Sequence, residues 1–361
     1  MTTPKVVDLF SGVGGLSLGI SEAGADVVLA VDNNEKALEA YNSNFPDKIT
    51  KNLDLSTADQ DDILSNTGIT KEEVDIVTGG PPCQGFSVMG KRDPDDERNN
   101  LLLKYAEHIS GLSPDYFVME NVKGLMSGDK REFLEEFLNE IRSAGYNIVE
   151  PIQVLDAAEF GVPQYRERVI VLGYRDTCPK PSYPTPDDSN VNSWDAIGDL
   201  PNNLDDVENG VYKGELGPQS DYVKKINSWK QKASTIPEGI TGLDPVDHSE
   251  RVRNRFADVD PGSNDEVSRY YRLKKTEPSV TLRAGSSPDR GTHTPARPIH
   301  PVAPRCITVR EAARIQSFPD WFQFSPTKYH GLRQIGNSVP PLLAKCIGDE
   351  LLECYTQSKA S

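Results

Sequence analysis

The sequence predicts an α/β fold with a doubly wound, mostly parallel sheet and a second, smaller and irregular domain. Short apolar runs rich in β-branched residues alternate with longer helix-like stretches through the first 175 residues. This alternation is typical of a parallel sheet covered by helices. It stops after Arg175, where a segment rich in Pro, Asp, Asn, Ser and Gly follows. The length of 361 residues suits one large domain and one small one.

The expected elements of the first half follow from these runs. Strands are predicted at Val6–Phe10, Val27–Val31, Val74–Thr78, Tyr116–Glu120, Ile148–Leu155 and Val169–Gly173. Helices are predicted at Leu16–Ala23, Lys36–Asn44, Asn99–Ser110 and Lys130–Ala144. Ligands bind at the carboxyl ends of the strands in such sheets, so the residues that follow each strand are the first candidates for a site.

Two further helices are expected near the C-terminus. In the helix Thr308–Ser317, Thr308 is the expected N-cap and Glu311 follows at the spacing of a capping box. The helix Pro341–Tyr355 begins with proline in its first turn and is expected to pack back on the sheet.

Composition narrows the class of protein. No run of about 18 apolar residues exists, which argues against a membrane span, and the N-terminus lacks the features of a signal peptide. A cytoplasmic location is therefore expected. The five cysteines include no CxxC pair and the five histidines are dispersed, so neither a disulfide framework nor a metal site is expected.

Charge is distributed unevenly along the chain. The formal net charge is −16, yet the segment from Arg251 to Arg314 contains 13 Lys and Arg against 7 Asp and Glu. One interpretation is a solvated loop region with salt bridges. The other is a surface that faces nucleic-acid phosphates, because fixed cations release counterions from a duplex.

A glycine-rich turn follows the first strand, from Asp8 to Gly19. Glycines at a strand-to-helix turn let a ligand approach the backbone closely. The dinucleotide pattern GxGxxG fails, because the sixth position counted from Gly12 is Ser17. Asp32 and Asp54 follow later apolar runs, and their carboxylates suit ribose hydroxyls and an adenine amino group.

A cysteine lies in a stiff loop after the next strand. The run GGPPCQGFS begins at Gly79 and places Cys83 among glycines and prolines. A lone cysteine is often a buried apolar residue, but this loop favours a nucleophile, whose active form is the thiolate. Glu120 ends the fourth strand, where a pocket role is favoured. Arg166 and Arg168 are expected on one side of a strand, either in salt bridges or as a clamp for an anion or carbonyl.

Six motifs in this order resemble those of the DNA (cytosine-5) methyltransferases of restriction-modification systems. They are FSGVGG from Phe10, PPCQGFS from Pro81, ENV from Glu120, QYRER from Gln164, REAARIQSFP from Arg310 and QIGNSVP from Gln334. The resemblance spans Asp8 to Pro341 and implies a sheet of the S-adenosylmethionine-dependent methyltransferase type.

The resemblance implies a role for each candidate residue. Cys83 would add to C6 of cytosine, Glu120 would contact N3 and the amino group, and Arg168 with Arg166 would hold the base and the active loop. The methyl donor would be S-adenosylmethionine, leaving S-adenosylhomocysteine. Its expected binding residues are Phe10, Gly12, Gly14, Asp32, Asp54, Pro82, Leu101, Asn337, Ser338 and Val339. The family more often has glutamate at the position of Asp32, one methylene longer.

The resemblance also implies partners and domains. The substrate would be double-stranded DNA with the target base flipped out of the stack, and a cognate restriction endonuclease would act separately. A lid is expected from Phe86 to Asn100. Residues 1–185 and 326–361 would form the catalytic domain and residues 186–325 the target-recognition domain.

Three alternatives stay open at this point. An RNA cytosine-5 methyltransferase would share the motifs, but the Cys-Phe-Thr run of such relatives is absent from this sequence. A non-catalytic DNA-binding relative would have the fold without the chemistry. An NAD-dependent oxidoreductase is disfavoured by the failed glycine spacing and the Pro-Pro-Cys loop.

Overall fold

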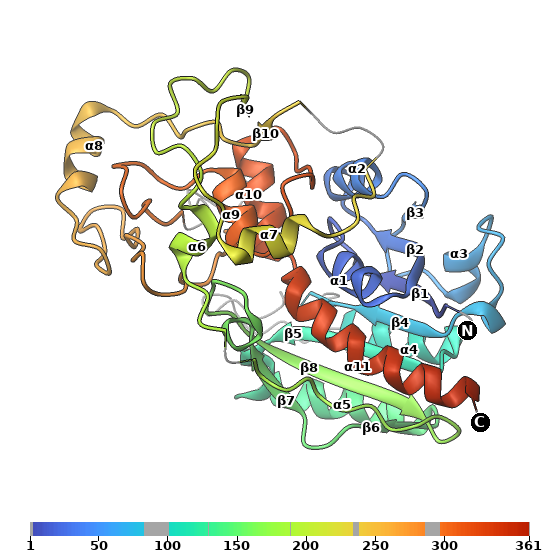
Figure 1. Cartoon of the computed structure of the whole chain (residues 1–361). Helices are drawn as coiled ribbons and strands as arrows, with labels where there is room; N and C mark the ends of the chain where they lie inside the picture. Colours follow the sequence, from blue (N-terminus) through green and yellow to red (C-terminus); the bar gives the residue numbers. More distant parts are fainter. Residues whose placement is uncertain are drawn as a thin grey trace.

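The computed structural model describes residues 3–82, 101–128, 130–187, 189–233, 238–285 and 297–360 (Figure 1). Cys83 and the expected lid from Phe86 to Asn100 lie outside the described residues. Among the described residues, no helix has both the length and the apolarity to cross a membrane.

A mixed sheet forms the centre of the fold. Its strands are β1 Lys5–Leu9, β2 Asp26–Asp32, β3 Ile49–Asn52, β4 Ile76–Gly79, β5 Tyr116–Val122, β6 Tyr146–Ile148, β7 Gln153–Asp156 and β8 Glu167–Arg175. The order is β3-β2-β1-β4-β5-β8-β6, and β7 also pairs with β8. Strands β1 to β5 are parallel to one another, whereas β8 runs antiparallel to β5, β6 and β7. The doubly wound, mostly parallel sheet is confirmed.

Helices cover both faces of the sheet. They are α1 Gly15–Ala23, α2 Glu35–Asn44, α3 Gln60–Leu64, α4 Leu101–Leu112, α5 Lys130–Ser143 and α11 Pro341–Ala360, with short 3-10 helices η1 Lys71–Glu73, η3 Lys123–Met126 and η4 Ala157–Phe160. Successive strand residues point to opposite faces. Val6 therefore packs with α1 and α11, while Val7 packs with α4 and α5, and Figure 1 shows these helix pairs on opposite sides of the sheet.

Two differences from the sequence prediction have local causes. The single strand expected at Ile148–Leu155 is two strands, β6 and β7, interrupted around Pro151, which lacks the N–H that a strand ladder needs. The strand β3 was missed because Ile49–Asn52 is a short edge strand of mainly polar residues without alternation.

The second half of the chain contains short elements joined by long connections. They are α6 Ser193–Ile197, α7 Asp221–Asn227, α8 Glu250–Ala257, α9 Val309–Ile315, α10 Lys328–Asn337 and the small hairpin of β9 Val211–Tyr212 with β10 Ile240–Thr241. Residues of α6, α7, α9 and α10 belong to the same buried apolar cluster as α1 and α11. The boundaries of the two expected domains stay a prediction.

The capping box of α9 is confirmed. The Thr308 hydroxyl accepts from the Glu311 backbone N–H at 3.2 Å, and the Glu311 carboxylate accepts from the Thr308 backbone N–H at 2.7 Å. Pro341 is the first residue of α11, as expected.

Candidate active site

The glycine-rich turn between β1 and α1 is held open by its backbone conformation and by Asp32. Phe10, Gly12 and Gly14 have φ of 57°, 56° and 92°. The Asp32 carboxylate accepts hydrogen bonds from the backbone N–H groups of Gly12 and Asn34, both at 2.8 Å. A Cβ at Gly12 would meet no atom within 4 Å. The space over Gly12 is therefore open to a ligand, and each Asp32 oxygen keeps a lone pair for ribose hydroxyls.

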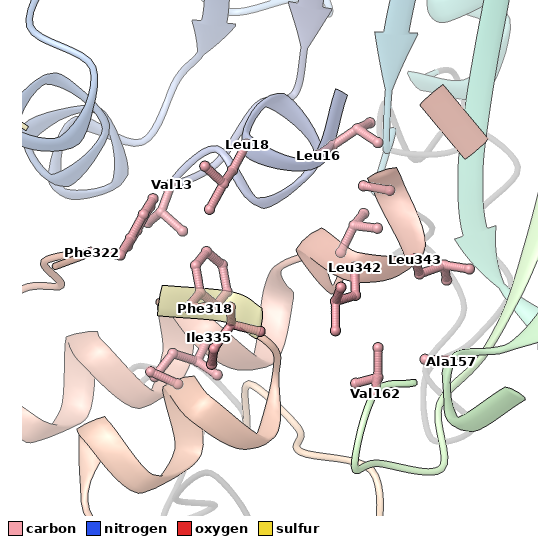
Figure 2. Packing of buried hydrophobic residues seen from close by; sticks show 14 of the residues in the cluster. Val13, Leu16, Leu18, Ala157, Val162, Phe318, Phe322, Ile335, Leu342 and Leu343 are labelled. Carbon is pink, nitrogen blue, oxygen red and sulfur yellow. The ribbon is translucent and has the colours of Figure 1, made fainter. Parts of the chain in front are cut away.

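The last motif lies against the same turn. A Cβ on Gly15 would come within 2.4 Å of the Val339 carbonyl oxygen, and one on Gly19 within 2.3 Å of the Pro341 carbonyl oxygen. These glycines let α1 approach the chain that leads into α11. Figure 2 shows the apolar side of this contact, where Val13 and Leu18 face Phe318 and Phe322. Two of the predicted cofactor segments, far apart in sequence, are thus brought together.

The remaining predicted cofactor residues lie at the ends of their elements. Asp54 is exposed, and its carboxylate accepts from the Ser56 backbone N–H at 2.9 Å. Leu101 begins α4, and Pro82 and Asn337 are exposed. Ser338 donates from its hydroxyl to the Gln334 carbonyl oxygen at 2.7 Å. None of these contacts excludes a bound ligand.

The buried carboxyl group of Asp8 links β1 to the elements on either side of it. Asp8 accepts hydrogen bonds from the hydroxyls of Ser17 and Thr78. Burial raises the pKa of Asp8 to about 7, although these hydrogen bonds oppose the rise. Burial likewise raises the pKa of Asp32, against the backbone N–H groups of Asn34 and Gly12.

Glu120 and Arg168 form the polar centre of the other half of the site. Arg168 Nε lies 2.7 Å from Glu120 Oε1, and each side chain is only 12% exposed. Glu120 Oε2 lies close to the backbone of Gly80, where a Cβ would be 3.2 Å away. The carboxylate therefore faces the start of the Pro-Pro-Cys loop.

Asn121 binds the described beginning of that loop. Its side-chain amide donates to the Pro81 carbonyl oxygen at 3.0 Å and accepts from the Val122 backbone N–H at 2.9 Å. The residue directly before Pro82 and Cys83 is thus tied to the end of β5, the strand that carries Glu120.

Arg166 and Arg168 bind different partners, although the sequence analysis grouped them. Arg166 is buried, and its guanidinium donates to the carbonyl oxygens of Leu282 at 2.9 Å, Gly336 at 2.8 Å and Ser338 at 3.0 Å. Burial lowers the pKa of Arg166 to about 9. These contacts join the beginning of β8 to the cofactor segment and to the second half of the chain, which is a positioning role.

Two glutamines extend this junction. The Gln164 side chain donates to Gln316 at 2.5 Å and accepts from the Leu282 backbone N–H at 2.9 Å. Gln316 in turn donates to the Ser338 carbonyl oxygen at 2.6 Å. Sequence reasoning gave neither glutamine a contact. Their presence inside the QYRER and REAARIQSFP runs was the available signal, but which backbone groups they would meet depends on the packing of distant segments.

The arginine-rich segment is partly structural, as the salt-bridge interpretation expected. Arg305 binds Glu311 through two hydrogen bonds of 2.8 Å, and Arg314 binds Asp320 through two of 2.7 Å. Arg272 and Arg310 are buried and donate to backbone carbonyl oxygens. The exposed cations of the segment remain candidates for a nucleic-acid surface: they are Arg251, Arg253, Arg269, Lys275 and Arg283.

Comparison with known proteins decides the family. The model of the C-5 cytosine-specific DNA methylases matches residues 4–353. The chain belongs to this family. It is 44% identical to the type II methyltransferase M.XorII of Xanthomonas oryzae pv. oryzae, over 98% of this chain and 85% of the relative. It is 35% identical to M1.HphI of Haemophilus parahaemolyticus, over 97% and 87% respectively.

Solved structures agree with this assignment. A crystal structure titled as a prophage-encoded DNA modification methyltransferase (E. coli) superposes with a TM-score of 0.83 and 33% identity, over 98% of this chain and all of that one. The S. pombe Dnmt2 methyltransferase, at 21% identity and a TM-score of 0.61, shares the fold. The protein is a type II DNA cytosine-5 methyltransferase that methylates cytosine in specific DNA sequences, and it uses S-adenosylmethionine as its family does.

Proposed function

We propose that this methyltransferase acts through a covalent adduct between Cys83 and C6 of a cytosine flipped out of duplex DNA. The observation that carries the proposal is the Arg168–Glu120 ion pair of 2.7 Å, with each side chain only 12% exposed, beside the backbone of Gly80. An acidic and a cationic side chain therefore lie beside Gly80, where the loop that carries Cys83 begins. Substrates bind at these strand ends in sheets of this type.

The Cys83 thiolate forms a bond to C6, and the electron pair of the C5–C6 double bond moves into a C4–C5 double bond. The electron pair of the C4–N3 double bond moves onto N3, which takes a proton from Glu120. C5 becomes enamine-like and nucleophilic. S-adenosylmethionine, when bound, supplies the electrophilic methyl group that C5 takes up. A base then removes the C5 proton, the C5–C6 double bond forms again, and the sulfur–C6 bond breaks to release the Cys83 thiolate. N3 returns its proton to Glu120, so the ring leaves as neutral 5-methylcytosine.

Each protein group has a separate task in this sequence. Glu120 hydrogen-bonds N3 and the exocyclic amino group, and so favours cytosine over other bases. Arg168 orients the Glu120 carboxylate and contacts the base, and Arg166 acts on the site by positioning the backbone of Gly336 and Ser338. Phe10, Gly12, Gly14, Asp32, Asp54, Pro82, Leu101, Asn337, Ser338 and Val339 would hold the methyl donor.

Methyl transfer from a radiolabelled donor to unmethylated genomic DNA tests the proposal. The wild-type chain is expected to label DNA at C5 of cytosine, and Cys83→Ala is expected to label none. Label in the Cys83→Ala product would refute the role of Cys83. The same assay on transfer RNA separates a DNA enzyme from an RNA enzyme.

The biological setting is part of the proposal. The relatives named above are type II methyltransferases, which supports a restriction-modification role in the cytoplasm, at the nucleoid. A cognate endonuclease would cut the same sequence when it is unmethylated. Resistance of genomic DNA to such a nuclease, present with the active enzyme and lost with Cys83→Ala, is the expected result.

A further inference from the structure

A cationic and aromatic cavity lies between Tyr165, three residues before Arg168, and residues of the second half of the chain. Its volume is about 470 Å³, and none of the described residues that line it is Asp or Glu. Its walls include Tyr165, Tyr270, Tyr271, Arg269, Arg283 and Arg297. This composition is unusual in a chain with a net charge of −16. A second cavity, near α2, is lined by both acidic and basic residues.

The arginines of this cavity differ from the structural arginines nearby. Arg305 and Arg314 have carboxylate partners, whereas no described carboxylate pairs with Arg269, Arg283 or Arg297. The Arg297 Nε is buried without a hydrogen-bond partner among the described residues. Arg269 and Arg283 are exposed. Among the described residues these cations have no carboxylate partner and the cavity has no acidic lining residue, so their guanidinium groups can bind an anionic ligand.

The cavity is connected to the active site through Tyr165. Tyr165 is 47% exposed, an unusual exposure for so large a ring. Its backbone N–H donates to the Ser279 carbonyl oxygen at 2.9 Å, and its own carbonyl oxygen accepts from the Thr281 hydroxyl at 2.6 Å. Arg168 follows three residues later, which is about 10 Å of extended chain. Successive nucleotides of a strand are about 3.4 Å apart along the duplex axis, so a nucleotide beside Tyr165 would lie within about three steps of a base held by Arg168.

We propose that this cavity binds one nucleotide of the duplex close to the target cytosine. Arg283 and Arg297 contact its phosphate or the edge of its base, and the ring of Tyr165 packs against its sugar or base. Aromatic side chains offer a stacking surface for any base, and guanidinium groups match both phosphate oxygens and the O6 and N7 edge of guanine. The inference rests on the proposed role of residues 186–325 in target recognition, and it assigns that role to particular side chains.

The test compares Arg283→Ala, Arg297→Ala and Tyr165→Ala with Arg142→Ala in the full chain. Arg142 is an exposed arginine of α5 that pairs with Glu150 and lies outside both the basic segment and the cavity. The probe is a fragment library of unmethylated genomic DNA. Three quantities are measured for each protein: the KM for DNA at several salt concentrations, the KM for S-adenosylmethionine, and the methylated sequences at base resolution.

The expected result is a KM for DNA at least roughly fivefold higher in the Arg283 and Tyr165 variants. The KM for S-adenosylmethionine should be unchanged in these variants, and Arg142→Ala should change neither KM. A lost phosphate contact would lower the salt slope by about 0.9 and weaken all sequences alike. A lost base contact would instead relax one position of the methylated sequence. Either outcome supports the nucleotide site.

The inference is overturned if all three cavity variants match Arg142→Ala in KM for DNA, salt slope and methylated sequence. A wild-type chain that methylates no DNA would overturn the proposed function instead, so the two failures are distinct. Because Arg283 and Tyr165 are exposed, their replacement is expected to preserve the fold, and retained binding of S-adenosylmethionine checks this.

Discussion

Replacing Gly12 by alanine should weaken cofactor binding strongly while reducing the stability of the fold only slightly. Gly12 has φ of +56° and a Cβ there would meet no atom within 4 Å. The change therefore costs only backbone strain, about 1 kcal/mol of unfolding free energy. Gly68 is a matched control because it has φ of +71° and equally open surroundings. It lies in the turn between α3 and η1. Both variants are expected to lose similar stability, about 2 °C in Tm.

The two variants should differ in ligand binding. If S-adenosylmethionine approaches the backbone of Gly12, an added methyl group costs about 1–3 kcal/mol of overpacking, or roughly a tenfold or greater rise in Kd. Gly68→Ala should bind as the wild type does. Isothermal titration with S-adenosylmethionine and with S-adenosylhomocysteine measures both. A wild-type Kd in Gly12→Ala would refute the placement of the cofactor over this turn.

Three further changes test other parts of the site. Glu120→Gln should lower kcat by about 10²-fold or more with an unchanged Kd for S-adenosylmethionine. The control is Glu167→Gln, at an exposed glutamate of the neighbouring strand β8 that pairs with Lys123, which should leave kcat unaltered; similar rates in both variants would remove Glu120 from the mechanism. Arg166→Met should reduce the free energy of unfolding by about 2–4 kcal/mol, because three buried carbonyl groups lose their hydrogen-bond donor. An unchanged midpoint of the urea unfolding curve would contradict this. Burial lowers the pKa of His300 to about 4, although Glu311 opposes the fall. Because the pKa of histidine is about 6.5 in the unfolded chain, the neutral ring contributes fully to the free energy of unfolding above pH 6.5, and up to about 3 kcal/mol is lost as the pH falls toward 4. His300→Asn should therefore weaken the pH dependence of the free energy of unfolding between those pH values.

Local patterns were enough to predict the sheet and most helices that flank it. The alternation of apolar runs gave β1, β2, β4 and β5 within two residues at either end. It could not give the direction of β8, because an antiparallel and a parallel buried strand have the same apolar character. The capping box of Thr308 and Glu311 was predictable because it depends on residues only three apart.

The site was predictable in its residue types but not in its contacts. The strand-end rule and the motifs singled out Glu120 and Arg168, and the structure joins them at 2.7 Å. The same motifs grouped Arg166 with Arg168, yet Arg166 binds carbonyl groups more than a hundred residues away in sequence. Such partners depend on how the two halves of the chain pack, and no local pattern records that packing.

The charge count had the same limit. It located a basic segment between Arg251 and Arg314, but it could not separate cations that bind internal carboxylates from those that do not. Only the three-dimensional neighbours distinguish Arg305, paired with Glu311, from Arg283, which has no described acidic partner.

The most direct test of the central claim is whether Cys83 forms a covalent bond to cytosine in DNA. The substrate is a genomic fragment library copied with 5-fluorocytosine in place of cytosine, so the recognition sequence need not be known. Fluorine at C5 cannot leave as a proton does, and the methylated adduct should therefore accumulate. Mass spectrometry of the digested complex is expected to find the base on the peptide that contains Cys83, only when S-adenosylmethionine is present. No adduct with the wild-type chain, or an adduct that persists in Cys83→Ala, would contradict the account.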